Sequence, residues 1–343
     1  MIRFDSDYTE GCHPRILEAL TRTNAEQHPG YGEDAHCAHA RSLIRAACAA
    51  PDADVHFLVG GTQVNTVVIA AALRPWEGVI SAESGHIACH ETGAVEAAGH
   101  KVLTLPHENG KLDAQTLGKA VAALRNDPNA EHIVQPGLVY ISQPTEFGTV
   151  YSRAELEAVS AVCRAAGLPL YLDGARLGCA LAAEPDLTLP DYARLCDAFT
   201  VGGTKMGCLF GEAAVIRSER LKPCFRNVMK QRGGMLAKGR LLGVQFEEMF
   251  ADGLYHECGR AAVGAARRIR AALLEKGLLL AFDSPTNQLF VTLTRAQSAA
   301  LERSFALGHW DTSGGETDVL RICTSWATTP EQTDALIEAI EAL

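Results

Sequence analysis

The chain has 343 residues, a charged fraction of 21% and a formal net charge of -10. This length suits one large core, or a large and a small domain, and the composition is that of an ordinary globular protein. The negative charge, and the absence of any block rich in lysine and arginine, argue against nucleic acid or an anionic membrane surface as a partner.

Cysteine usage and the polar start of the chain predict a cytoplasmic protein. The N-terminal segment is too polar for a secretory signal, and no uninterrupted apolar stretch approaches the length of a membrane span. The 11 cysteines include no C-x-x-C pair, which is typical of reduced, mostly buried thiols in a cytosolic enzyme.

Apolar runs and helical patterns alternate along most of the chain. A first helix is predicted at 15–20, with Pro14 in its first turn. Strands of one sheet are expected at 55–59, 79–81, 102–105, 138–141, 168–172, 198–201 and 213–216, the last of them antiparallel. Helices are expected at 64–73, 87–98, 114–124 and 155–166. Two further helices, strands at 289–293 and 319–323 and a final helix at 331–342 follow.

This alternation predicts an α/β fold with two parts. The large domain is expected to span 31–245 and to hold a mostly parallel sheet of about seven strands. The small α+β domain is expected to combine 1–30 with 246–343.

A glycine-rich turn joins the first of these strands to an apolar helix. Gly60, Gly61 and Thr62 stand at that turn, where unpaired N–H groups and the helix dipole favour an anion. The turn lacks the G-K-[ST] ending of a P-loop and the G-x-G-x-x-G fingerprint, so alone it is a weak signal for phosphate.

A histidine pair stands at the start of the helix predicted from residue 87. His86 and His90 have the i, i+4 spacing of a metal site, but the H-E-x-x-H motif is absent. A lone histidine pair on a helix is more often solvated or structural, so no metal is expected here.

An aspartate and a lysine each follow a buried strand. Asp173 and Lys205 are about one strand–helix–strand unit apart, and a right-handed crossover puts both at the same edge of the sheet. Either residue alone is usually a solvated loop residue. Together they suit pyridoxal phosphate, because the carboxylate pairs with the pyridinium nitrogen and the lysine forms the Schiff base. Burial near a cation such as Arg176 would lower the pKa of that lysine.

The segments Asp173-Gly174-Ala175-Arg176 and Gly203-Thr204-Lys205 carry a resemblance to a known family. Over nearly its whole length the chain resembles the threonine aldolase group of pyridoxal-phosphate enzymes, which have the fold-type I, aspartate-aminotransferase-like architecture. The resemblance implies a pyridoxal-phosphate-dependent carbon–carbon lyase that forms a homodimer or homotetramer with shared active sites.

The resemblance also implies the residues that hold the cofactor. His86 stacks on the pyridine ring and is a possible proton-transfer group, and Arg176 contacts the ring 3-oxygen. The phosphate is expected to be bound by Gly61, Thr62 and Thr204 and, from a neighbouring subunit, by Lys230.

Four residues are implied for the substrate. Arg321 interrupts an apolar strand and needs an anionic partner or a cleft, and a bidentate substrate carboxylate fits that need. Ser6 is expected to help bind the same carboxylate, and Tyr31 to lie at the site near a subunit boundary. Thr145 stands where the better-studied branch of the family has a histidine that contacts the substrate hydroxyl. A second, bacterial branch of low-specificity threonine aldolases has a Thr-Glu pair here, and with Thr145-Glu146 this chain looks closer to that branch. A threonine hydroxyl is a poor base, so the base stays open, with His86 or a water it holds as first candidate.

The expected reaction is retro-aldol cleavage of L-threonine or L-allo-threonine to glycine and acetaldehyde. One alternative is a β-eliminating lyase on the same fold, which would release pyruvate and ammonia. A second alternative is a non-catalytic binding module, against which the retention of a Schiff-base lysine argues.

Overall fold

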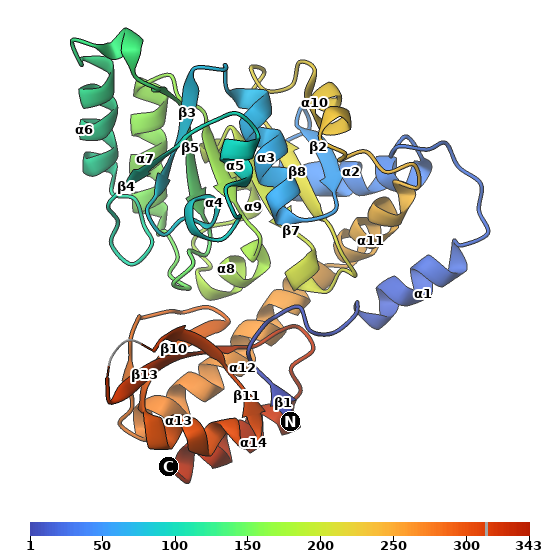
Figure 1. Cartoon of the computed structure of the whole chain (residues 1–343). Coiled ribbons are helices and arrows are strands. Elements are labelled where there is room, and N and C mark those ends of the chain that lie inside the picture. Colours follow the sequence, from blue (N-terminus) through green and yellow to red (C-terminus); the bar gives the residue numbers. More distant parts are fainter. Residues whose placement is uncertain (313–314) are drawn as a thin grey trace.

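The large sheet has seven strands in the order β2-β8-β7-β6-β5-β3-β4 (Figure 1). The structure is a computed structural model that describes residues 1–312 and 315–343. The strands are β2 (Asp54–Leu58), β3 (Glu77–Ala82), β4 (Val102–Leu105), β5 (Gln135–Ser142), β6 (Leu170–Asp173), β7 (Ala198–Gly202) and β8 (Glu212–Ile216). Only β8 runs antiparallel to its neighbours. The predicted mostly parallel sheet, with an antiparallel strand at 213–216, is confirmed.

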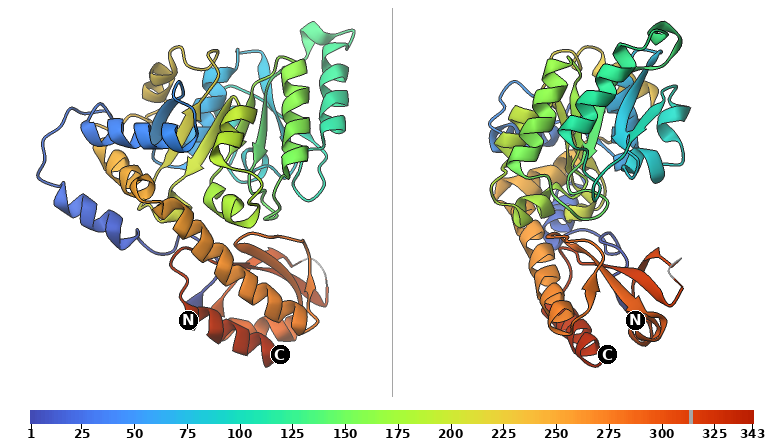
Figure 2. Two further views of the ribbon diagram at one scale, coloured as in Figure 1. Left: turned by 180° about the vertical axis from the view of Figure 1, so that it is seen from behind. Right: turned by 90° about the vertical axis from the view of Figure 1, so that its left-hand side faces the viewer.

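Helices cover both faces of this sheet (Figure 2). Alternate residues of one strand point to opposite faces, so Val139 and Ile141 join one hydrophobic cluster while Leu138 and Tyr140 join the other. The helices are α2 (Ala35–Ala47), α3 (Gly61–Ala72), α4 (His86–Cys89), α5 (Ala94–Ala97), α6 (Ala114–Arg125), α7 (Arg153–Ala165), α8 (Leu177–Ala183), α9 (Leu189–Leu195), α10 (Phe225–Gln231) and α11 (Arg240–Ala251), with single 3-10 turns at η1 (Ala130–His132) and η2 (Thr204–Met206). Burial on both faces explains why the strands read as continuous apolar runs in the sequence.

The prediction of one continuous helix from 87 to 98 is wrong. The stretch from 87 to 98 forms the short helices α4 and α5 with a break between them. Thr92 and Gly93 adopt the left-handed conformation, with φ of 53° and 70°, and this conformation cannot continue a right-handed helix.

A smaller layer lies below the large sheet in Figure 1, and it contains both chain termini. Its four-stranded antiparallel sheet has the order β12-β13-β10-β9, and a separate pair joins β1 to β11. The strands are β1 (Ile2–Arg3), β9 (Leu279–Leu280), β10 (Gln288–Thr294), β11 (Phe305–Ala306), β12 (Gly308–Asp311) and β13 (Thr317–Cys323). The helices are α12 (Leu254–Glu275), α13 (Arg295–Glu302) and α14 (Pro330–Glu341). The strands predicted at 289–293 and 319–323 are confirmed as the neighbours β10 and β13.

The first helix, α1 (Pro14–Arg22), packs against α11, and its Ile16 belongs to the larger hydrophobic cluster. A separate cluster, which includes Phe4 and Leu320, fills the smaller layer. The domain limits 1–30, 31–245 and 246–343 stay a prediction. Among the described residues, no helix is both long and apolar enough to cross a membrane.

The parallel strands end at one edge of the large sheet. The carboxyl ends of β2, β3, β5, β6 and β7 lie there, together with the start of β8, because Glu212 pairs with both Leu58 and Gly202. This edge faces the smaller layer, since one cavity is lined from both parts. Side chains that follow these strands therefore meet between the two layers.

Two glycines of α12 give a matched test of how closely this helix packs on α8. A Cβ on Gly259 would lie 2.2 Å from the carbonyl oxygen of Gly178, whereas a Cβ on Gly264 would meet nothing within 4 Å. We expect Gly259→Ala to lower the free energy of unfolding by about 1–3 kcal/mol through overpacking. We expect Gly264→Ala to raise it by about 0.5–1 kcal/mol through helix propensity. Urea unfolding of both variants measures these changes. Equal changes in the free energy of unfolding would contradict the close packing of α12 on α8 at Gly259.

Candidate active site

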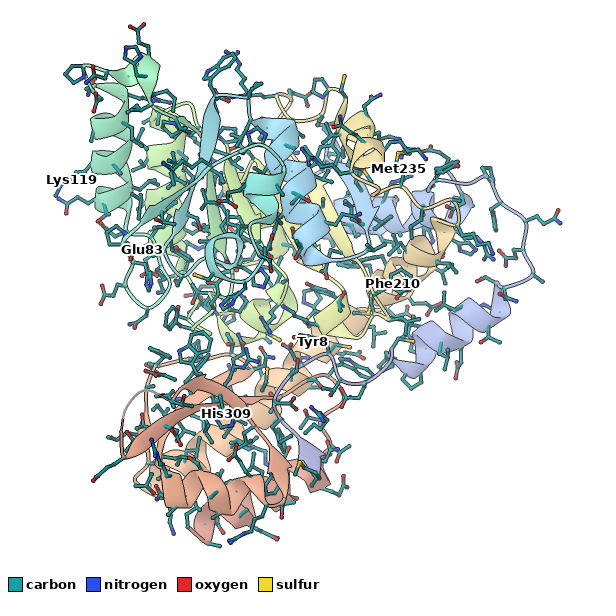
Figure 3. The ribbon with its side chains drawn as sticks, in the orientation of Figure 1. Tyr8, Glu83, Lys119, Phe210, Met235 and His309 are labelled. Carbon is teal, nitrogen blue, oxygen red and sulfur yellow. The ribbon has the colours of Figure 1, made fainter. Side chains whose placement is uncertain are left out.

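Two adjoining cavities of about 300 Å³ and 590 Å³ lie at the sheet edge. The first extends from the β2–α3 turn to the residues after β6 and β7, and the second extends to Arg321 and Trp310 of the smaller layer. In Figure 3, Tyr8 lies between the two layers and His309 lies on the smaller one. Five residues line both cavities: Tyr8, His86, Glu146, Arg176 and Lys205. These five residues therefore mark the junction of the cavities.

Asp173 and Lys205 line the same cavity, which confirms the expectation that both lie at one sheet edge. The strands that position them, β6 and β7, are parallel neighbours. Burial, followed by the positive charge of Arg176, lowers the pKa of the Lys205 amine, against the opposing effect of Asp7, Glu212 and Asp173. The predicted lowering of this pKa is confirmed. Among the described residues, no carboxylate lies within ion-pair distance of the Lys205 amine.

The buried Asp173 carboxylate is held by three hydrogen-bond donors. Its Oδ1 accepts from the backbone N–H of Ala175 at 3.0 Å. Its Oδ2 accepts from Asn65 Nδ2 at 3.0 Å and from the Tyr140 hydroxyl at 2.8 Å. These donors fix the orientation of the carboxylate toward the cavity.

The same carboxylate is linked to His86 through helix α3. Asn65 Nδ2 also donates to Glu91 Oε1 at 2.7 Å, and this oxygen lies 2.8 Å from His86 Nδ1. The side-chain oxygen Oδ1 of Asn65 in turn accepts from the Tyr171 hydroxyl at 2.6 Å. Glu91 is therefore placed to keep a proton on His86 Nδ1, which leaves Nε2 as the acceptor of the neutral ring.

On its other side, His86 contacts Glu146. Glu146 Oε1 accepts from the His86 backbone N–H at 2.8 Å and from the Ser142 hydroxyl at 2.7 Å. Ser142 Oγ lies 3.3 Å from the Tyr140 hydroxyl, which donates to Asp173. A closed ring of polar contacts thus joins His86, Glu91, Asn65, Asp173, Tyr140, Ser142 and Glu146.

Sequence reasoning missed most of this polar ring. Asn65 carried a usable signal, because a buried asparagine inside an apolar helix needs a hydrogen-bond partner. Glu91 follows a short helix near exposed residues and gave no such signal. Glu146 was recognisable only as the second residue of the Thr145-Glu146 pair, with no role of its own implied.

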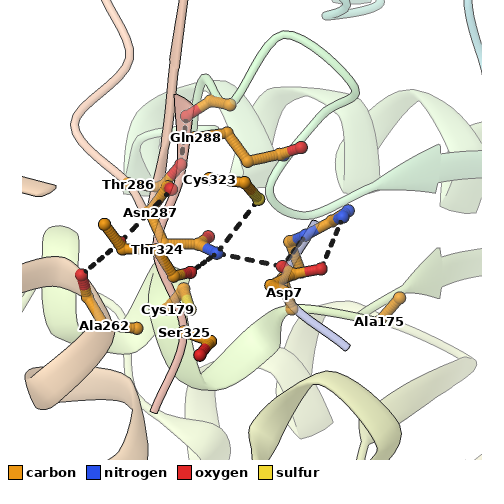
Figure 4. Close-up of polar contacts among 12 residues, drawn as sticks. Asp7, Ala175, Cys179, Ala262, Thr286, Asn287, Gln288, Cys323, Thr324 and Ser325 are labelled. Carbon is orange, nitrogen blue, oxygen red and sulfur yellow. Dashed lines mark hydrogen bonds and ion pairs between the residues drawn. The ribbon is translucent and has the colours of Figure 1, made fainter. Parts of the chain in front are cut away.

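Arg176 lies at the junction of the two cavities, where it forms an ion pair with Asp7. Arg176 Nε lies 2.5 Å from Asp7 Oδ2, and Nη2 lies 3.1 Å from Oδ1. Asn287 Nδ2 donates to the same Oδ2 at 2.9 Å (Figure 4). Burial would raise the pKa of Asp7, but the charges of Arg176 and Lys205 and the hydrogen bonds from Arg176 and Asn287 lower it to about 2. The role of Asp7 was not predicted from the sequence.

The start of helix α3 offers unpaired donors to the first cavity. No side chain caps this helix, and a Cβ on Gly60 or Gly61 would meet nothing within 4 Å. Thr62 and Thr204 also line the cavity. The Thr204 hydroxyl accepts a hydrogen bond from the backbone N–H of Gly211 at 3.0 Å, which fixes its position.

Arg321 lines the second cavity without a carboxylate partner in the described part of the chain. Its Nη2 donates to the carbonyl of Asp5 at 2.9 Å, and its Nη1 contacts Gln288 Oε1 at 3.5 Å. The Ser6 hydroxyl and Gln288 Nε2 are buried with no hydrogen-bond partner among the described residues, and Gln288 lines this cavity whereas Ser6 lines neither cavity. An anion bound beside Arg321 would give such donors a partner.

Thr145 lines the first cavity, but its hydroxyl is used within its own loop. It lies 2.7 Å from the Thr149 hydroxyl and 3.3 Å from the carbonyl of Asn109. The hydroxyl is therefore not free for a substrate in this conformation.

Tyr31 and Lys230 do not line either cavity of their own chain. They lie together, with Lys230 Nζ 4.6 Å from the centre of the Tyr31 ring, and both are exposed. The structure therefore does not bring these two predicted residues to Lys205.

Outside the cavities, Glu26, His28 and His36 bring three possible metal ligands within 4.8 Å of one another. Each ligand atom already has a partner in this group, since Glu26 Oε2 lies 2.8 Å from His28 Nε2 and 2.9 Å from His36 Nε2. The group is accounted for as hydrogen-bonded ion pairs at the surface.

The residues at the sheet edge fit pyridoxal phosphate. Asp173 is a buried, oriented carboxylate for the ring nitrogen, and Lys205 is an amine with a lowered pKa and no ion-pair partner. The uncapped start of α3, with the open space beside Gly60 and Gly61, suits a phosphate. The donor set and the space thus match the three chemical parts of this cofactor.

Comparisons with known protein families, related sequences and solved structures agree with one another. The sequence profile of the family described as beta-eliminating lyase matches residues 4–307. A low-specificity L-threonine aldolase of a Pseudomonas species is 30% identical, over 99% of this chain and 97% of its own length.

Solved structures extend the comparison. The threonine aldolase of Leishmania major is 46% identical, superimposes with a TM-score of 0.97 and covers 100% of this chain and 99% of its own. The serine palmitoyltransferase of Sphingomonas wittichii, with 15% identity, a TM-score of 0.73 and coverage of 99% of this chain and 86% of its own, shares the fold alone. The predicted fold-type I architecture is confirmed.

The Asp7–Arg176 ion pair predicts a pH dependence of stability. Because the pKa of Asp7 is about 2 in the folded state and its ordinary value is 3.8, its ionised form stabilises the fold above about pH 4. This contribution, of about 2 kcal/mol, is lost as the pH falls from about 4 toward 2.

We therefore expect the difference in unfolding free energy between wild type and Asp7→Asn to shrink as the pH falls from 7 to 3. Urea unfolding of the apoprotein at both pH values measures it. A difference that is constant or grows toward pH 3 would rule out this assignment.

Proposed function

The chain belongs to the beta-eliminating lyase family and is a pyridoxal-phosphate-dependent lyase, and we propose that it cleaves L-threonine and L-allo-threonine to glycine and acetaldehyde. The observation that carries the proposal is the pair of adjoining cavities, which together form the cleft: Asp173 lines the first, Arg321 lines the second, and Lys205 lines both. The relatives named threonine aldolase, matched over nearly the whole chain, support this substrate class.

Bound pyridoxal phosphate supplies an electron sink for the electrons of the breaking bond. Lys205 would hold the cofactor through its amine, and Asp173 would pair with the ring nitrogen. His86 would lie flat against the ring, while Arg176 would contact the ring 3-oxygen. The phosphate would be bound by Gly61, Thr62 and Thr204.

The substrate carboxylate would be bound by the Arg321 guanidinium and the Ser6 hydroxyl. A bidentate contact from Arg321 fixes the rotation of the substrate about Cα, and this orientation selects the bond to Cβ for cleavage. Thr145 would bound the space beside Cβ. The contact of His86 Nδ1 with Glu91 makes Nε2 the nitrogen through which this histidine, as the first candidate base, would exchange a proton.

We also propose a homodimer or homotetramer in which each cleft is completed by a second subunit. Tyr31 and Lys230 lie together on the surface, outside their own cleft, which suits a contribution to the cleft of a partner. In such an assembly Lys230 would bind the cofactor phosphate. All 11 cysteines are free thiols, which supports a reducing compartment such as the cytoplasm.

The alternative of β-elimination is favoured only by the description of the family. A β-eliminating lyase would use the same Lys205 and Asp173 but would release pyruvate and ammonia. The products therefore separate the two reactions.

The proposed reaction predicts acetaldehyde from L-threonine. We expect cofactor-loaded wild type to consume NADH when L-threonine is added with coupled alcohol dehydrogenase, because acetaldehyde is reduced to ethanol. Lys205→Ala should be inactive, since Lys205 is the lysine proposed to hold the cofactor and, among the described residues of the chain, the lysine that lines both cavities. No NADH consumption with either threonine or allo-threonine, or formation of pyruvate, would contradict the proposal.

The shared cleft predicts complementation between two impaired variants. Lys205→Ala and Lys230→Glu, each impaired alone, should regain activity when their subunits are mixed after mild dissociation. In a hybrid dimer one cleft carries both substitutions and the other carries neither, so random mixing restores about a quarter of the clefts. No gain above the sum of the two variants would contradict a role of Lys230 across the subunit boundary.

A further inference from the structure

We propose that Glu146 is the group that takes the proton from the substrate's β-hydroxyl group, at its Oε2 atom. The inference rests on the proposed function, because it assigns a step of that reaction. It replaces His86, or a water held by His86, as first candidate for the base.

Glu146 lies at the junction of the two cavities. Like Lys205, it lines both of them, whereas Asp173 lines only the first of the two and Arg321 only the second. A substrate joined to the cofactor at one end and bound to Arg321 at the other would place Cβ at this junction.

The two carboxylate oxygens of Glu146 differ in their hydrogen bonds. Oε1 accepts two hydrogen bonds, from the Ser142 hydroxyl and from the His86 backbone N–H, and these hold the side chain in one orientation. Oε2 is buried and has no hydrogen-bond partner among the described residues. A buried carboxylate oxygen without a donor is costly, and a hydroxyl donor arriving with the substrate would remove that cost.

The environment also makes Glu146 a better base. Burial raises the pKa of Glu146, against the lowering effect of the hydrogen bond from Ser142. A carboxylate with a raised pKa accepts a proton more readily near neutral pH than an ordinary surface carboxylate does.

The other candidate groups are less well placed. The Thr145 hydroxyl is hydrogen-bonded to Thr149 and to the carbonyl of Asn109. His86 is proposed to lie flat against the cofactor ring, and a ring stacked in this way presents its face, rather than its nitrogens, to the bound adduct. The contribution of His86 to the step is then positional, since its backbone N–H holds Glu146 Oε1.

The step balances as follows. The hydroxyl O–H proton passes to Glu146 Oε2, the O–H electron pair forms the carbonyl of the leaving aldehyde, and the Cα–Cβ bond breaks. The electron pair of that bond remains on Cα, which regains a proton from solvent to give glycine. Glu146 releases its proton to solvent and returns to the carboxylate.

The test compares Glu146→Gln with wild type on two ligands. Glutamine has the same shape and can still accept the hydrogen bonds made to Oε1, but it cannot accept a proton. We expect kcat for L-threonine to fall between about 10²- and 10⁴-fold. The dissociation constant of glycine, measured by calorimetry, should stay within about twofold of wild type, because glycine has no β-hydroxyl group. Glu146→Asp, which keeps a carboxylate, should recover part of the rate.

The pH profile separates Glu146 from His86. Wild type and His86→Phe, which keeps a flat ring but has no ring nitrogen, should both lose kcat/KM on the acid side, as Glu146 takes up a proton. Glu146→Gln should lack this acid limb.

Three outcomes would overturn the inference. If Glu146→Gln keeps the acid limb and a rate within tenfold of wild type, Glu146 is not the acceptor. If it loses glycine binding as well as rate, its role is structural. If wild type cleaves no β-hydroxy amino acid, the proposed function itself fails, and that result is distinct because it needs no variant.

Discussion

The buried ion pair between Asp7 and Arg176 connects three distant parts of the chain. Asp7 comes from the N-terminal segment, Arg176 from the turn after β6, and Asn287, which also donates to Asp7, from the segment before β10. Removing one partner of such a pair leaves an uncompensated buried charge, at a cost of about 3–5 kcal/mol. The pair therefore joins the two layers of the protein at the place where the cleft opens, and it holds Arg176 at the junction of the cavities.

This arrangement controls the charge of Lys205. Burial and Arg176 lower the pKa of the Lys205 amine, while Asp7 and Glu212 act in the opposite direction. Asp7 has a lowered pKa and is ionised near neutral pH, but its carboxylate forms an ion pair with Arg176. Burial raises the pKa of Glu212 to about 7, so near neutral pH this carboxyl group is only partly charged. The charges of these carboxylates therefore do not cancel the lowering of the Lys205 pKa by burial. A lowered pKa favours the neutral amine, which is the form that attacks an aldehyde.

The sequence predicted the parts of the structure that depend on local patterns. All seven strands of the large sheet were found because each is a short apolar run, and the shared edge of Asp173 and Lys205 followed from chain topology. The break between α4 and α5 was missed, because the left-handed backbone at Thr92 is not visible in an apolar pattern.

The polar contacts at the site were harder to predict. Asp7 meets Arg176 across 169 positions of sequence, and Asn65 meets Asp173 across 108. No local pattern encodes such pairs, because they form only when the sheet edge brings the segments together. Arg321 was a candidate because an arginine inside an apolar strand violates a local rule, and it does line the second cavity, whereas Glu146 violates no such rule in a polar loop. Residues that break a local pattern were therefore recognisable, and residues whose role depends on a distant partner were not.

We propose that Lys205, at the sheet edge, is the residue that holds pyridoxal phosphate. Borohydride treatment of the cofactor-loaded protein, followed by proteolysis and mass spectrometry, is the decisive experiment, because reduction makes the link between cofactor and amine permanent. We predict a pyridoxyl phosphate group on the peptide that contains Lys205, and on no other lysine. Labelling of a different lysine, or a Lys205 peptide that stays unmodified in protein known to carry the cofactor, would contradict it.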